Sequence, residues 1–134
     1  MVKAVFADAF YFVALLNRGD QHHAKVTAAA RQLRENLITT EWVLMELADA
    51  LAESGSRRLV APFIRDLSQD PKVQIVPVSE DLFQRGLRLY EERQDKGWTL
   101  TDCTSFVVMG DGNITDALTG DHHFEQAGFK ALLT

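Results

Sequence analysis

The sequence predicts an α/β fold, organised as a three-layer α/β/α sandwich around a parallel sheet of about five strands. First, short apolar runs of β-prone residues alternate along the chain with longer segments of helical periodicity, so helices are expected to connect successive strands. Second, the composition is that of an ordinary globular protein, with 46% hydrophobic and 25% charged residues. Third, no linker, repeat or low-complexity tract divides the chain, so we expect a single domain over residues 1–134.

The first part of the chain contains two predicted strands and three predicted helices. The strands cover residues 2–7 and 37–39, and the helices cover residues 9–17, 21–36 and 41–53. Asp8 ends the first apolar run where strand becomes helix, and Thr40 is expected to cap the third helix. That helix is apolar nearly all round, so we expect it to be largely buried. Its exception is an acidic stripe of Glu46, Asp49 and Glu53.

The middle of the chain is predicted to form a helix, a strand and a second helix. They cover residues 59–68, 73–76 and 80–94. Asp70-Pro71 forces a turn before the strand, and Ser79 caps the second helix. Lys96-Gly97 then ends that helix, so the next element begins close to Trp98.

The last part of the chain opens with Thr99 and Asp102, which fit the Thr-x-x-Asp start of a helix. Apolar residues at helical spacing continue this helix to Met109. It is followed by a strand over residues 114–118, a short helix over residues 122–126 and a strand over residues 129–132. We expect Asp102 to lie off the buried face, in a first turn where the helix macrodipole favours a carboxylate.

Charge and cysteine content restrict the classes of function. The single cysteine, Cys103, cannot form an internal disulfide and lies on an apolar helix face, which fits a reducing, cytoplasmic location. Asp8 interrupts the N-terminal apolar run, so no signal peptide is expected, and no segment approaches membrane-spanning length. The net charge of −5 argues against a strongly basic nucleic-acid surface, although acids gathered around a metal would lower this count by themselves.

Four acidic residues are expected at one edge of the sheet. Ligands of parallel sheets bind at the carboxyl ends of the strands. Asp8 and Asp121 lie at or just after such ends, while Glu46 and Asp102 lie in the opening turns of helices that could reach the same rim. Clustered carboxylates repel one another unless a cation or raised pKa values compensate, and oxygen ligands suit Mg²⁺ or Mn²⁺. A divalent ion beside a phosphodiester activates water for in-line attack, which is nuclease chemistry.

These residues and their surroundings resemble the PIN-domain ribonucleases, among them the VapC-type toxins of bacterial toxin–antitoxin pairs. The resemblance covers essentially the whole chain, and its most specific segments are WTLTDCTSF around Asp102 and LTGDHHFEQAGF around Asp121. It implies that Asp8, Glu46, Asp102 and Asp121 are the catalytic residues that bind Mg²⁺ or Mn²⁺ for cleavage of RNA. It also implies a cognate antitoxin that blocks the active site, and a homodimer in which two acidic sites border one groove.

One position departs from the family pattern. Many relatives have a hydroxyl residue two positions after the first aspartate, where this chain has Phe10, which leaves the positioning of water open. Ser105, one helical turn after Asp102, and Thr119, two residues before Asp121, are candidates for supporting substrate or water. Asp116 is a competitor of Asp121, although it lies within the strand pattern, where a rim position is less natural.

Structural interpretations of the same residues remain open at this stage. Asp8 and Asp121 could simply cap helices, and Glu46 could belong to a solvent-facing acidic stripe. The paired histidines His22-His23 and His122-His123 are interpreted as ordinary helix positions, since no further ligand completes a zinc site. Trp42 and Trp98 adjoin apolar stretches and are assigned to the core or to a subunit interface.

The sequence therefore predicts a metal-dependent endoribonuclease, with two alternatives. The first is a magnesium-binding signalling domain of the response-regulator receiver type. It requires an acceptor aspartate after a middle strand, but the strand over residues 73–76 is followed by Pro77-Val78. The second is a PIN-like RNA-binding module without turnover, against which the four acids argue.

Overall fold

The computed structural model describes residues 3–134, which form a five-stranded, all-parallel sheet in the order β3-β2-β1-β4-β5. The strands are β1 Ala4–Ala7, β2 Asn36–Thr40, β3 Val73–Val76, β4 Asp116–Leu118 and β5 Lys130–Ala131. The helices are α1 Ala9–Leu16, α2 His23–Gln32, α3 Glu41–Ala50, α4 Arg57–Gln69, α5 Glu80–Glu92, α6 Leu100–Asp111 and α7 His122–Gln126. The predicted α/β class and the parallel sheet of five strands are confirmed.

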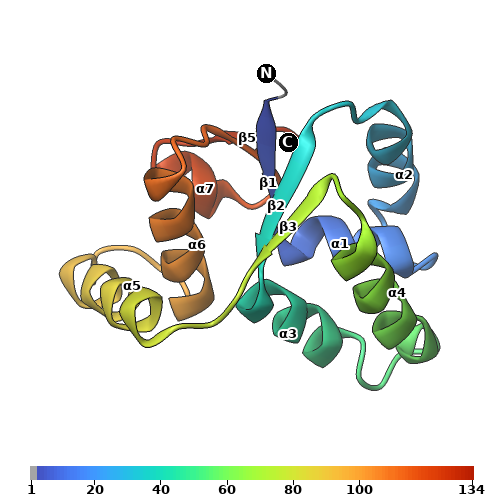
Figure 1. Cartoon of the computed structure of the whole chain (residues 1–134), viewed down its shortest axis with the longest axis horizontal. Coiled ribbons are helices and arrows are strands. Elements are labelled where there is room, and N and C mark those ends of the chain that lie inside the picture. Colours follow the sequence, from blue (N-terminus) through green and yellow to red (C-terminus); the bar gives the residue numbers. More distant parts are fainter. Residues whose placement is uncertain (1–2) are drawn as a thin grey trace.

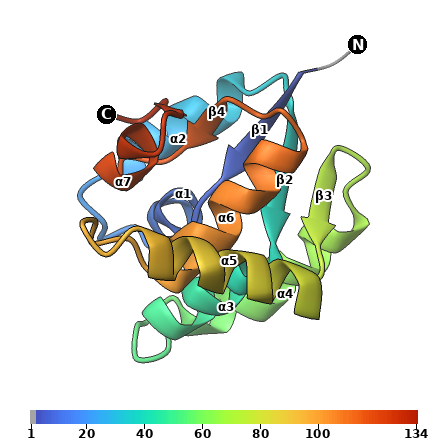
Figure 2. The ribbon, with the colours of Figure 1, turned by 90° about the vertical axis from the view of Figure 1, so that its left-hand side faces the viewer.

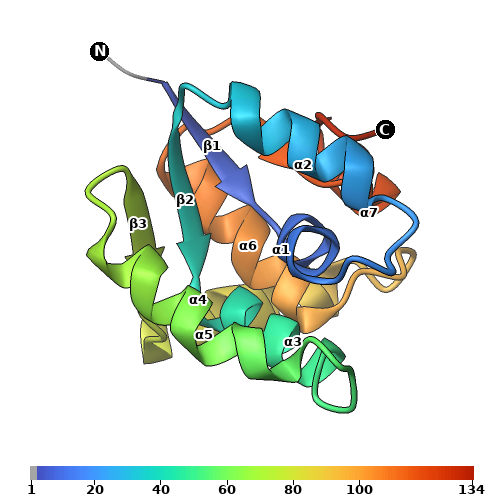
Figure 3. The same cartoon turned by 90° about the vertical axis from the view of Figure 1, so that its right-hand side faces the viewer.

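Helices cover both faces of this sheet (Figure 1). Helices α5, α6 and α7 lie on one side (Figure 2), and α1, α2 and α4 lie on the other (Figure 3). Helix α3 begins directly after β2 and lies beyond the carboxyl ends of the strands. Within the described part of the chain, no helix is long and apolar enough to cross a membrane.

Two expectations about the helices are not met, one about where a helix ends and one about how deeply a helix is buried. Helix α2 ends at Gln32, four residues early, because the backbone at Leu33 is extended and Asn36 already pairs with Ala4 in the sheet. The expectation that α3 is largely buried is wrong, because it covers the sheet with one face only. Val43, Leu44 and Leu47 are buried, whereas the side chain of Met45 is 59% exposed. Residue 2 of the first predicted strand lies outside the described residues.

The central strand and an aromatic cluster fix the elements that carry the acidic residues. Val5, Phe6 and Ala7 of β1 are buried, as expected for a strand with helices on both faces. The ring of Phe106 in α6 packs edge-on against Phe124 in α7, with 5.0 Å between centroids. This contact holds α6 and α7 together.

Helix α5 packs closely on α6 through Gly86, which is buried. A β-carbon at Gly86 would lie 2.6 Å from Cγ2 and 3.3 Å from the backbone nitrogen of Thr104. Rotation of the Thr104 side chain is restricted, since its hydroxyl donates a hydrogen bond of 2.8 Å to the carbonyl of Thr101. This crossing therefore requires glycine.

We expect Gly86→Val to reduce the free energy of unfolding by about 2 kcal/mol, because overpacking at this crossing must separate α5 from α6. The measurement is urea unfolding followed by circular dichroism. Gly110→Val is the matched control, because Gly110 is also helical and a β-carbon there meets nothing within 4 Å. Equal decreases in the free energy of unfolding in the two variants would contradict close packing at Gly86.

Candidate active site

The four acidic residues selected from the sequence converge beyond the carboxyl end of the sheet. Asp8 follows β1, Glu46 lies in the second turn of α3, Asp102 lies in the first turn of α6, and Asp121 precedes α7. Their charges act on one another: Glu46 and Asp102 both raise the pKa of Asp8, and Asp102 and Asp121 both raise the pKa of Glu46. Four separate elements thus bring their carboxylates into one cluster.

Asp8 is deeply placed, with only 6% of its surface exposed. It occupies the N-cap position of α1 but makes no side-chain capping hydrogen bond, so capping does not explain it. Its Oδ2 instead accepts a hydrogen bond of 2.9 Å from the hydroxyl of Thr119. Burial, followed by the nearby negative charges, raises the pKa of Asp8 to about 7, although the Thr119 hydrogen bond acts in the opposite direction.

Asp102 forms a complete capping box with Thr99. Its backbone N–H donates to the Thr99 hydroxyl, and its Oδ2 accepts from the Thr99 N–H, both at 3.0 Å. The expectation that Asp102 lies off the buried face is wrong, because its surface is only 6% exposed. Helix α6 is covered by α3 and α7 as well as by α5, so even its first turn is enclosed.

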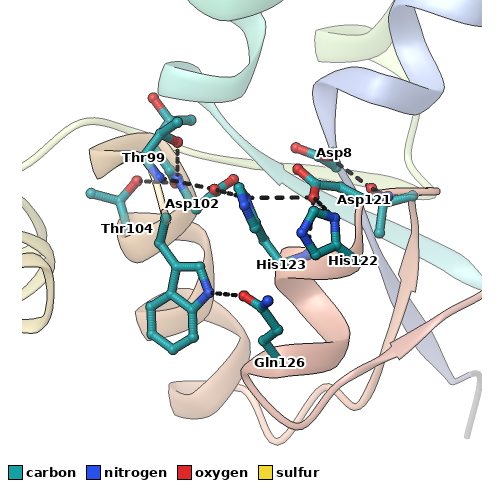
Figure 4. A network of polar contacts seen from close by, with 11 residues as sticks. Asp8, Thr99, Asp102, Thr104, Asp121, His122, His123 and Gln126 are labelled. Carbon is teal, nitrogen blue, oxygen red and sulfur yellow. Dashed lines mark hydrogen bonds and ion pairs between the residues drawn. The ribbon is translucent and has the colours of Figure 1, made fainter. Parts of the chain in front are cut away.

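His123 connects Asp102 with Asp121 (Figure 4). Its Nδ1 lies 3.0 Å from Oδ2 of Asp102 and 3.5 Å from Oδ1 of Asp121. An ionised carboxylate can only accept hydrogen bonds, so a hydrogen bond between an ionised Asp102 and His123 requires the tautomer with a hydrogen on Nδ1. Asp121 also caps α7, since its Oδ1 accepts from the His123 backbone N–H at 2.9 Å. His123 was missed in the sequence analysis, where the histidine pair was assigned to ordinary helix positions.

Glu46 is the most open member of the cluster. Partial burial raises the pKa of Glu46, the charge of Asp102 raises it further, and a hydrogen bond with the Thr101 side chain acts in the opposite direction. The residue nevertheless remains exposed on α3. Glu46 therefore lies where the acidic cluster meets solvent. It belongs both to this cluster and to the acidic stripe that it forms with Asp49 and Glu53.

Thr119 is well placed to support the cluster, whereas Asp116 is not. The Thr119 hydroxyl donates to Asp8 and accepts from the Asp121 backbone N–H at 3.0 Å, so it links two of the acids. Ser105 is buried, and its hydroxyl has no hydrogen-bond partner among residues 3–134. Asp116 begins β4, at the opposite end of that strand, and pairs with the ammonium group of Lys3 at 2.9 Å.

Phe10 packs over the turn that carries Thr119 and Asp121. A β-carbon at Gly120 would lie 2.6 Å from Cζ of Phe10. The Phe10 ring also lies 4.8 Å from the His22 ring, between centroids. Phe10 is thus a packing residue, while the hydroxyl that reaches Asp8 comes from Thr119.

The carboxylates of this rim are of the chemical type that binds a divalent cation, and among residues 3–134 the ligand atoms that lie within 4.8 Å of one another belong to Asp121, His122 and His123. Among residues 3–134, no lysine or arginine nitrogen lies within 4.0 Å of the carboxylates of Asp8, Glu46, Asp102 or Asp121. Burial raises the pKa of both Asp8 and Glu46, and the neighbouring carboxylates raise it further, so ionisation of these two groups is disfavoured unless a cation is bound. Carboxylate oxygens are the ligands that hard divalent ions prefer.

The parallel sheet and the acidic rim at its carboxyl edge define an α/β protein with a candidate nuclease site. Residues 5–130 match the family model described as "PIN domain", and the chain belongs to this family. It is 29% identical over 126 residues to the 23S rRNA-specific endonuclease VapC20 of Mycobacterium tuberculosis, and the match covers 93% of this chain and 95% of that protein. The predicted family and the relationship to VapC proteins are confirmed.

Solved structures agree with this assignment. The crystal structure of M. tuberculosis VapC20, described as a sarcin-ricin loop cleaving toxin, superposes with a TM-score of 0.85 at 25% identity, covering 93% of this chain and 95% of that one. FitAcB from Neisseria gonorrhoeae has a TM-score of 0.64 at 17% identity, with 95% and 94% coverage, and supports the fold alone. The chain is therefore a homologue of PIN-domain ribonucleases, and the receiver-like alternative is wrong.

Proposed function

We propose that this protein is a divalent-metal-dependent endoribonuclease that hydrolyses RNA phosphodiester bonds, and that it is the toxin of a toxin–antitoxin pair. The observation that carries the proposal is the convergence of four carboxylates from four elements of a PIN domain, with no lysine or arginine nitrogen of residues 3–134 within 4.0 Å of them. The relative VapC20, described both as a 23S rRNA-specific endonuclease and as a sarcin-ricin loop cleaving toxin, supports the same chemistry.

In this proposal, Asp8, Glu46, Asp102 and Asp121 hold Mg²⁺ or Mn²⁺. The bound ion would lower the pKa of a coordinated water and neutralise charge on the phosphate. Thr119 orients Asp8 through its hydroxyl, and His123 orients Asp102 through Nδ1, so the acids are held at fixed angles before substrate arrives. No side chain becomes covalently attached to RNA.

The proposal includes partners and a location. A cognate antitoxin would bind over the acidic rim, and a homodimer would place two rims beside one groove, as the family resemblance implies. Dimerisation would also gather scattered cations along an RNA path, which matters for a chain of net charge −5. We further propose that residues 1–134 act as one domain in the cytoplasm, where RNA and antitoxin are both present.

The function is tested by incubating purified protein with structured and single-stranded RNAs, including a sarcin–ricin stem-loop, in Mg²⁺, in Mn²⁺ and in chelator. We expect cuts only with a divalent ion. Glu46→Gln is expected to reduce cleavage by about a hundredfold, because it removes a ligand charge. Asp49→Asn, which removes a charge from the same acidic stripe one turn further along α3, is the matched control and should retain activity.

Two outcomes would contradict the proposal. Cleavage that persists in chelator or in Glu46→Gln would show that another site or a contaminant is responsible. RNA binding without cleavage at any metal concentration would instead favour a PIN-like binding module. Because Glu46 is exposed, loss of folding does not complicate the comparison.

A further inference from the structure

A cavity that is separate from the acidic cluster lies at the turn that joins α5 to α6. It has a volume of about 440 Å³, within the range of small-ligand sites. Residues 90–98 supply its lining, including Tyr90, Gln94 and Trp98. None of these residues belongs to the acidic cluster.

The cavity and the acidic cluster share a wall. Gly97 lines the cavity, and a β-carbon at this position would lie 3.7 Å from Nε2 of His123. The other ring nitrogen of His123 contacts Asp102 at 3.0 Å. The His123 ring therefore lies between Gly97, at the edge of the cavity, and Asp102, so the cavity and the acidic rim are neighbouring features of the molecule.

The back of the cavity is rigid and aromatic. Trp98 is only 6% exposed, packs edge-on against Phe106 and donates a hydrogen bond of 3.0 Å from Nε1 to Oε1 of Gln126. The guanidinium of Arg93 lies 5.0 Å from the centre of the Trp98 ring system. Asp95 holds this guanidinium with two hydrogen bonds, of 3.0 and 3.1 Å. These contacts fix the cavity wall before any ligand binds.

The rim of the cavity offers an open aromatic ring and polar side chains. Tyr90 is 48% exposed, although it is a large aromatic residue. Arg93 and Lys96 both approach Asp95, and Glu91 also lines the cavity, so the local charge is nearly balanced. Such a site favours an uncharged, flat group that stacks on an aromatic ring over an isolated phosphate. The amide of Gln94 and the carboxylate of Glu91 can hydrogen-bond to the edge of that group.

We propose that this cavity binds a nucleobase of single-stranded RNA, next to the phosphate that is cleaved at the acidic rim. Unstacked bases are recognised in proteins by aromatic rings, by arginine planes and by hydrogen bonds to their edges, and the cavity provides all three. Tyr90 is the stacking residue. The inference rests on the proposed ribonuclease function and adds to it a subsite for substrate selection.

The first test compares cleavage kinetics on an RNA that the parent protein cuts. Tyr90→Ala is expected to raise KM about tenfold with kcat within twofold, because a stacking contact is lost away from the reacting atoms. Tyr90→Phe keeps the ring and should restore the parental KM. Phe83→Ala is the matched control, because Phe83 is an exposed aromatic residue of the same helix that does not line the cavity.

The second test does not depend on turnover. In a Trp42→Phe background, Trp98 is the only tryptophan, and its fluorescence is titrated with the four nucleoside 5′-monophosphates. At least one of them is expected to give a saturable change that Tyr90→Ala abolishes and Phe83→Ala preserves.

An unchanged KM in Tyr90→Ala overturns the inference, as does a fall in kcat alone. If the parent cuts none of the RNAs, the proposed function fails independently. The fluorescence titration then tests nucleobase binding by itself. Trp98 fluorescence that does not change with any of the four monophosphates overturns the inference.

Discussion

Replacing Asp8 with asparagine is expected to stabilise the metal-free protein at about pH 8 and to reduce RNA cleavage about a thousandfold. The folded-state pKa of Asp8 is about 7, above its ordinary value of 3.8, mainly because the carboxyl group is buried. The folded protein therefore holds more protons than the unfolded chain between these pH values. As a result, the free energy of unfolding falls as the pH rises through this window. The loss of stability that comes from ionising the buried Asp8 carboxyl is complete above about pH 7.

Asparagine removes this charge but keeps an oxygen that can accept the Thr119 hydrogen bond. At about pH 8 the free energy of unfolding of Asp8→Asn is expected to exceed that of the parent by roughly 1–3 kcal/mol. This difference should disappear near pH 4, where Asp8 is protonated in the folded protein. Cleavage is lost because a neutral amide is a poor ligand for Mg²⁺ or Mn²⁺. The measurements are urea unfolding in chelator at several pH values and RNA cleavage with added metal.

Asp116→Asn is the control for this prediction. Lys3 holds the pKa of Asp116 below its ordinary value, so removal of that charge should not stabilise the protein at about pH 8. Asp116 also lies away from the acidic cluster, so cleavage should be retained. A loss of stability in Asp8→Asn at about pH 8 would show that the Asp8 carboxylate is compensated in the metal-free protein, contrary to its burial.

The order of elements could be predicted because local signals agree with the tertiary structure. Thr40, Ser79 and Thr99 cap helices as expected, and each side chain accepts a hydrogen bond from the backbone three residues later. The end of α2 could not be predicted in the same way. Its helical pattern continues past Gln32, but pairing of Asn36 with β1 takes the following residues into the sheet.

The members of the acidic cluster could be predicted, but their environment could not. Asp8 and Asp121 follow strands of a parallel sheet, so the fold class alone places them on one rim. The burial of Asp102 depends on α3 and α7 packing against α6, and the role of His123 depends on α7 lying beside α6. These contacts join residues far apart in the chain, and no periodicity of the sequence encodes them.

Asp102→Asn is expected to reduce metal-dependent cleavage about a thousandfold while leaving the fold intact. The amide oxygen can still accept the Thr99 N–H, so the capping box is largely retained, and what is lost is a negative charge at the proposed metal site. His123→Ala, by contrast, should reduce the rate of metal-dependent cleavage about tenfold to a hundredfold, because it removes only the group that orients Asp102.

The double variant Asp102→Asn, His123→Ala shows whether His123 acts only by orienting the Asp102 side chain or has a separate role in cleavage. If His123 acts through Asp102, the double variant should be no slower than Asp102→Asn alone, since effects within one functional unit are not additive. His123→Asn, whose amide N–H can occupy the place of Nδ1, should recover part of the activity. His122→Ala is the comparison at the neighbouring histidine, whose Nδ1 lies 3.6 Å from Oδ1 of Asp121 and which does not contact Asp102, so its effect should persist in full in an Asp102→Asn background. Additive losses in the double variant would mean that His123 contacts metal, water or RNA directly.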